Sequence, residues 1–159
     1  MRVVYWLETF PPPSDKSIFL AGPTPRHEGV QTWRPKALET LERLGYDGVV
    51  FVPEYRNGQL PKVDMAAYTD RIDWETSALA RAQVIAFWVP RVLETMPAFT
   101  TNIEFGEWFK SGKIVLGTPP EARKVSYMRY RAGQHLVPLA ETLEDTLKLA
   151  LRKLGDLAK

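Results

Sequence analysis

The sequence predicts a doubly wound α/β domain, in which helices cover both faces of a mainly parallel sheet. Nearly continuous apolar runs, such as Ile18–Ala21, Val49–Val52 and Val84–Val89, are typical of parallel strands that are buried on both faces. Segments with helical periodicity alternate with these runs. Four runs end in exits that contain proline. Because proline cannot continue a central ladder, each exit marks the carboxyl end of a strand.

The elements follow in a simple order along the chain. Residues Val3–Leu7 are expected to form a short strand, and we expect the sheet proper to begin after the three prolines at 11–13. The predicted strands of the sheet are 18–21, 49–52, 84–89, 114–116 and 136–137, and the predicted helices are about 33–44, 67–82, 100–109 and 143–154. Five strands in the order 2-1-3-4-5 give a flavodoxin-like sandwich. We expect a single domain over residues 1–159.

Composition narrows the function classes. The chain has 159 residues, of which 45% are hydrophobic and 25% charged, as expected for one soluble globular domain. The net charge of +2 provides no broad field for binding nucleic acid. The absence of cysteine excludes disulfides and thiolate metal sites, and His27 and His135 alone do not suggest a histidine-rich metal site. The first residues lack the apolar run of a signal peptide, so we expect a cytoplasmic location.

The stretch Thr100–Trp108 carries the strongest candidate for chemistry, Glu104. We expect Glu104 in the first turn of a helix, where the positive end of the helix dipole favours an ionised carboxylate. An ionised, fixed carboxylate can act as a nucleophile. Thr101 and Glu104 also have the spacing of a capping box, in which the glutamate only closes the helix end. The two interpretations are compatible.

The loop that follows the predicted strand 18–21, Gly22-Pro23-Thr24-Pro25-Arg26, is a candidate binding loop. Glycine permits close approach of the backbone, and the threonine hydroxyl and arginine guanidinium are suited to a sugar or a phosphate. The loop lacks the glycine spacing of a Rossmann site or a P-loop. A tight turn with a solvated arginine is the alternative.

Three further features could contribute to a site or could be purely structural. Asp73 could pair with Glu104 and give the two carboxylates that glycosyl transfer requires, although acids on a helix usually face solvent. Trp74 could stack on a base or pack in the core. The basic segment Arg123–Arg131 could bind phosphate or nucleic acid, or form a solvated face or a subunit contact.

Five segments together resemble the nucleoside 2-deoxyribosyltransferase-like family. They are Phe19–Arg26, Val50–Glu54, Asp73–Glu75, Ala86–Arg91 and Thr100–Gly106, and the resemblance covers about residues 17–120. It implies a flavodoxin-like fold and cleavage of the N-glycosidic bond of 2-deoxynucleosides or their monophosphates. Transfer to another base or to water, without a metal or redox cofactor, would complete the reaction. A homo-oligomer is also expected from the resemblance.

The resemblance implies roles for particular residues. Glu104 matches the glutamate nucleophile, and Asp73 matches the aspartate that orients the nucleophile or assists protonation of the leaving base. The loop of Gly22, Pro23, Thr24 and Arg26 matches the segment that lines the sugar site, and Glu54 matches a position near the base.

The chain departs from the family pattern at Ala98. Family members have an aspartate or a phosphate-binding serine six residues before the nucleophile, and Thr100, Thr101 or Asn102 could replace that contact. A non-catalytic sensor of nucleosides or nucleotides on the same fold is the alternative function.

Overall fold

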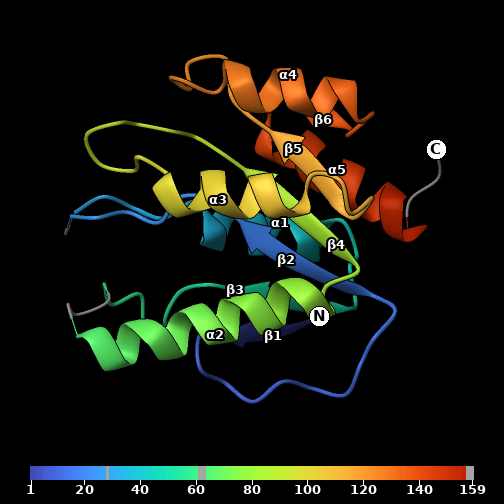
Figure 1. The fold of residues 1–159 in the computed structure, drawn as a ribbon. Coiled ribbons are helices and arrows are strands. Elements are labelled where there is room, and N and C mark those ends of the chain that lie inside the picture. The colour runs from blue at the N-terminus through green and yellow to red at the C-terminus, as the bar shows by residue number, and fades with distance from the viewer. Residues whose placement is uncertain (28, 61–63, 157–159) are drawn as a thin grey trace.

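The computed structural model describes residues 1–27, 29–60 and 64–156, and these contain a six-stranded sheet (Figure 1). The spatial order is β1-β3-β2-β4-β5-β6, and every neighbouring pair is parallel. The strands are β1 (Arg2–Tyr5), β2 (Ser17–Ala21), β3 (Val49–Val52), β4 (Val84–Trp88), β5 (Ile114–Gly117) and β6 (Leu139–Ala140). The predicted domain range also includes 28, 61–63 and 157–159, which lie outside the described residues.

The predicted strand order is confirmed, and the strand count is corrected. The five strands from β2 to β6 have the expected order 2-1-3-4-5. The N-terminal segment, which we expected to lie outside the sheet, adds β1 as a sixth strand beside β3. Its inclusion follows from burial, because Val4 is 2% exposed and lies in register with Phe51.

The last strand begins later than residues 136–137, where the sequence predicted it. Leu136 has a left-handed backbone with φ of 54°, and the amide of Val137 donates to the carbonyl of Ala132. Both features belong to the end of the preceding helix. The amide of Leu116 instead bonds the carbonyl of Pro138, which directs β6 to the edge of β5.

Five helices cover the sheet within the described residues: α1 (Arg34–Arg43), α2 (Met65–Arg81), α3 (Phe99–Trp108), α4 (Ser126–Gln134) and α5 (Leu143–Leu154). One buried cluster joins one sheet face to α2, α3 and α4 through Trp74, Phe105 and Met128. A second cluster joins the other face to α1 and α5 through Leu41 and Leu151. Figure 1 shows α2 and α3 in front of the sheet and α1 and α5 behind it.

The starts of α2 and α3 lie at the edge formed by the carboxyl ends of the strands, on the left in Figure 1. Asp64 caps α2 by accepting a hydrogen bond from the amide of Ala66. The start of α3 has no side-chain cap, because Ala98 precedes the helix in a left-handed conformation with φ of 61°. In the part of the chain that the structure describes, no helix is both long and apolar enough to cross a membrane.

Gly117, at the end of β5, provides a test of the packing between the sheet and α5. A Cβ atom there would lie 1.9 Å from Oγ1 of Thr146 and 2.6 Å from the Trp88 ring. Gly117→Ala is therefore expected to lower the free energy of unfolding by about 2 kcal/mol in urea denaturation. Gly133→Ala in α4, where a Cβ meets no atom within 4 Å, is the control and should stabilise by about 0.5 kcal/mol. Equal stability of the two variants would contradict this packing.

Candidate active site

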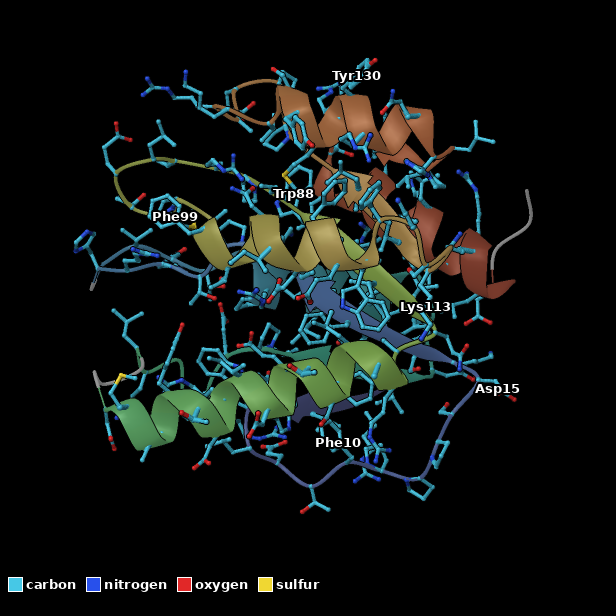
Figure 2. The ribbon with its side chains drawn as sticks, in the orientation of Figure 1. Phe10, Asp15, Trp88, Phe99, Lys113 and Tyr130 are labelled. Atoms are coloured by element: carbon cyan, nitrogen blue, oxygen red, sulfur yellow. The ribbon has the colours of Figure 1, made fainter. Side chains whose placement is uncertain are left out.

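A cavity of about 470 Å³ opens at the carboxyl edge of the sheet, between α2 and α3. Its walls come from segments that are far apart in sequence: the end of β1, the loop after β2, the starts of α1 and α3, and one face of α2. This is the edge where ligands bind in open, parallel α/β sheets. Figure 2 shows Phe99, which lines the cavity, at the start of α3.

The loop after β2 requires glycine at its first position. Gly22 has φ of 149°, and a Cβ there would lie 2.0 Å from the carbonyl oxygen of Trp88. The backbone of β2 therefore passes against β4 more closely than a side chain would allow. Gly22, Pro23 and Thr24 all line the cavity, as the sequence predicted.

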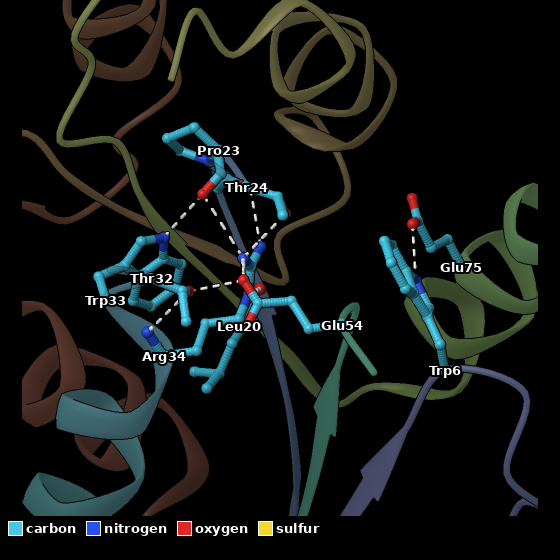
Figure 3. Close-up of polar contacts among 10 residues, drawn as sticks. Trp6, Leu20, Pro23, Thr24, Thr32, Trp33, Arg34, Glu54 and Glu75 are labelled. Carbon is cyan, nitrogen blue, oxygen red and sulfur yellow. Dashed lines mark hydrogen bonds and ion pairs between the residues drawn. The ribbon is translucent and has the colours of Figure 1, made fainter. Parts of the chain in front are cut away.

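A buried arginine, Arg34, fixes this loop from the first turn of α1 (Figure 3). Its side chain is 1% exposed. The guanidinium donates to the carbonyls of Leu20 at 3.2 Å and Gly22 at 2.7 Å, and to the hydroxyl of Thr24 at 3.1 Å. Arg34 also lines the cavity. Sequence reasoning missed Arg34; the signal was an arginine that directly follows Trp33 at a helix start near the carboxyl edge.

Glu54 is engaged by other protein groups. Its Oε1 atom lies 2.6 Å from Nη1 of Arg34 and accepts a hydrogen bond from Thr32, also at 2.6 Å. The residue is 8% exposed and does not line the cavity. Glu54 is thus the counter-charge of Arg34, and it lines an adjoining cavity of about 540 Å³ that Trp6 and Thr24 also line. Its predicted place near the base stays a prediction.

The helix α2 presents Tyr68, Arg71, Ile72 and Glu75 to the cavity. Their spacing of three, four and seven residues places them on one helix face. Asp73 lies off that face, is exposed and does not line the cavity. The predicted approach of Asp73 to Glu104 is therefore wrong in geometry, and Glu75, two residues later, occupies that place. On the cavity face of α2, Arg71 is buried and Ile72 is exposed.

Trp6, just after β1, orients Glu75. The indole Nε1 donates to Oε1 of Glu75 at 2.8 Å (Figure 3). Arg71 lies over the same indole ring at 5.6 Å and donates to the hydroxyl of Tyr55 at 3.2 Å. Sequence reasoning missed Trp6 because β1 was placed outside the sheet, although a tryptophan at the carboxyl end of a strand is a usable signal.

Glu104 projects into the cavity from the second turn of α3, because the helix begins at Phe99. The predicted capping box is absent: Thr101 is buried within the helix, and the residue before the helix is Ala98. The predicted stabilisation of the charged form is also wrong. Burial, reinforced by the neighbouring carboxyl of Glu75, raises the pKa of Glu104 to about 8.

Glu75 and Glu104 form a carboxyl pair that shares a hydrogen bond. Burial also raises the pKa of Glu75, and the hydrogen bond from Trp6 opposes that shift. Two neighbouring, half-buried carboxyls do not readily ionise together, because the first negative charge opposes the second, so the pair passes through a form with one proton and one negative charge. We assign this proton to the pair and not to one residue, because a small change in surroundings can move it between the carboxyl groups of Glu75 and Glu104.

The remaining predicted residues divide between the cavity and other places. Arg26 lines the cavity from an exposed position, where its guanidinium lies 5.0 Å from the Phe99 ring centroid. Trp74 is core: it stacks on Phe10 and donates to the carbonyl of Glu8. Asn102 does not line the cavity, because its side chain accepts a hydrogen bond from Arg91.

Of the three residues that could replace a polar contact at Ala98, only Thr100 lines the described cavity. Thr101 is 1% exposed within α3, and Asn102 is directed to Arg91. Ala98 itself lines the cavity.

The fold and the cavity define a class: a doubly wound α/β protein with a carboxyl pair at the ligand edge of its sheet. The family described as nucleoside 2-deoxyribosyltransferase like matches residues 15–122, and the chain belongs to this family. A solved structure of the 2-deoxyribosyltransferase from the psychrotolerant bacterium Bacillus psychrosaccharolyticus shares its fold, with a TM-score of 0.59 and 20% identity, over 87% of this chain and 95% of that chain. No curated protein sequence matches the chain.

The raised pKa of Glu104 predicts a particular pH dependence of stability. Between about pH 4.5 and pH 8 the folded protein binds more protons at this group than the unfolded chain does, so stability falls as pH rises. Glu104→Gln removes this slope. Relative to the unmodified protein, the variant should gain about 1–3 kcal/mol of unfolding free energy between pH 5 and pH 9, measured by urea denaturation. A difference that does not change with pH would contradict the shift.

Proposed function

We propose that this protein cleaves the N-glycosidic bond of 2-deoxynucleosides or deoxynucleoside monophosphates through a covalent glycosyl-Glu104 intermediate. The observation that carries the proposal is the Glu75–Glu104 pair at the wall of a ligand-sized cavity. Family membership supports the same chemistry. In this proposal the protein is a transferase or a hydrolase, according to whether another base or water receives the sugar.

The pair has the proton inventory that the first half-reaction needs. A carboxylate oxygen of Glu104 attacks C1′ of the sugar as the bond from C1′ to the base nitrogen breaks. The shared proton leaves the pair through Glu75 and passes to the departing base. The products are a deoxyribosyl ester of Glu104, the free base and ionised Glu75, so charge and protons balance. In the second half-reaction Glu75 accepts a proton from water or from the incoming base.

The residues that surround Glu75 and Glu104 support these roles. Trp6 holds Glu75 by the 2.8 Å hydrogen bond and supplies an aromatic surface in the cavity wall. The Gly22–Thr24 segment and Thr100 supply polar groups suited to the sugar hydroxyls. Water and an acceptor base would compete for the ester. A cavity that excludes water would favour transfer to the base, and a cavity that admits water would favour hydrolysis.

Replacement of Glu104 tests the nucleophile. Glu104→Ala and Glu104→Gln should each lower kcat/KM for base release by about 10³-fold or more, because each removes the carboxylate that forms the ester. Chromatography of free base from a panel of deoxynucleosides and their monophosphates measures the effect. Circular dichroism confirms folding of the variants. Full activity in either folded variant would overturn the assignment.

A pair of variants on α2 distinguishes Glu75 from Asp73. Glu75→Gln should lower kcat/KM by about 100-fold, because it removes the group that gives the proton to the base. Asp73→Asn changes an exposed carboxyl on the same helix and should retain kcat/KM within about two-fold. The reverse ranking would restore the role that the sequence resemblance gave to Asp73.

A further inference from the structure

We propose that Arg34 is a positioning residue for the Glu75–Glu104 pair: its guanidinium, fixed by Glu54 and by the carbonyls at the end of β2, holds a buried positive charge in the wall of their cavity. The catalytic meaning of this inference rests on the proposed function. Its test does not, because the protonation of the pair can be measured without turnover.

The first observation is the rigidity of the guanidinium. Arg34 is 1% exposed and donates hydrogen bonds from all three of its nitrogens, to the carbonyls of Leu20 and Gly22 and to the carboxylate of Glu54. A charge that is held in this way cannot turn toward solvent when the cavity empties or fills. Its field at the cavity is therefore a fixed property of the fold.

The second observation is the asymmetry of the ion pair. Arg34 lines the cavity, whereas its partner Glu54 does not. Arg34 is therefore the member of the ion pair that reaches the cavity of the two carboxyls, and Glu54 cancels only part of its field there. Consistent with this arrangement, the charge of Arg34 lowers the pKa values of both Glu75 and Glu104, against the dominant effect of burial.

Other charged groups also act on the pair. Arg71, on α2, lowers the pKa of Glu75, and Glu107, on α3, raises the pKa of Glu104. Asp64 and Arg26 line the mouth of the same cavity from exposed positions, where solvent screens their charges. Arg34 is distinctive because it acts on both carboxyls and is fully buried.

The consequence concerns the proton inventory of the reaction. Without a nearby cation, the buried pair would keep two protons to higher pH and would lack the negative charge that attacks the sugar. With Arg34 in place, the form with one proton and one charge becomes available at lower pH. Arg34 thus acts through Glu75 and Glu104, without a need to contact the substrate.

Two variants change this field in opposite directions. Arg34→Met removes the cation and should shift the first ionisation of the pair upward by about one pH unit. Glu54→Gln removes the partner anion, leaves Arg34 uncompensated and should shift the same ionisation downward. Arg34→Lys keeps the positive charge, so the first ionisation of the pair should lie close to that of the unmodified protein. Lys36→Met, which removes an exposed charge from the same helix, is the matched control and should leave the ionisation unchanged.

The measurement is a pH titration of the side-chain carboxyl carbons by NMR, in protein labelled with ¹³C-glutamate. Spectra of the Glu75→Gln and Glu104→Gln variants assign the two signals, and thermal melts confirm folding. Opposite shifts in Arg34→Met and Glu54→Gln support the inference. If Arg34→Met does not fold, the downward shift in Glu54→Gln decides the question. An unchanged or upward ionisation in folded Glu54→Gln would overturn the inference.

The outcome is independent of whether the protein turns over nucleosides. Opposite shifts without any base release would retain Arg34 as the group that sets the charge of the pair, and would count against the proposed function alone. Base release together with carboxyl ionisations that do not shift in the variants would support the proposed function and would count against the role of Arg34. If both hold, the acid limb of the pH profile of kcat/KM should move with the NMR ionisation in the folded variants.

Discussion

The buried guanidinium of Arg34 is the interaction on which the ligand edge of the sheet depends. Strand ends expose carbonyls that have no ladder partner, and burial of such groups without hydrogen bonds is costly. Arg34 satisfies the carbonyls of Leu20 and Gly22 and in turn needs an anion, which Glu54 supplies at 2.6 Å. Removal of one member would leave a buried charge without its partner, at a cost of about 3–5 kcal/mol. The same interaction therefore links β2, β3 and α1 at the place where the cavity forms.

On the other side of the cavity, the constraint is that two carboxyls share one space. Glu75 reaches it from α2 and Glu104 from α3, and burial makes double ionisation unfavourable. Such a pair is expensive for stability, since an apolar pair of similar size would pack there without desolvation. A destabilising group of charges is typical of active sites, where a fixed arrangement of charge is kept at a cost in stability.

The sequence predicts the fold well because the signals are local and repeated. Apolar runs followed by proline exits locate four strands, and the alternation with helices fixes their order. The prediction from sequence fails for elements whose position depends on packing between distant segments. A short strand near the N-terminus is predicted from the sequence, but its place in the sheet depends on the pairing of β1 with β3, which the sequence does not reveal. For the site, the segment that bears Glu104 is found from its motif. Asp73 and Glu75 are only two positions apart in sequence but lie on nearly opposite sides of α2, and only the packing of that helix decides which of them faces Glu104. The partners of Arg34 lie at or just after the ends of β2 and β3, so pairwise spacing cannot reveal them.

The central claim is that Glu104 becomes covalently attached to the sugar, and rapid acid quench followed by intact-protein and peptide mass spectrometry tests it most directly. The protein would be mixed for milliseconds to seconds with a deoxynucleoside or monophosphate that it cleaves, with no acceptor base present. The account predicts a transient mass increase of one deoxyribosyl group, carried by the peptide that contains Glu104 and absent from Glu104→Gln. Base release without an adduct at any time, or an adduct on another residue, would contradict it.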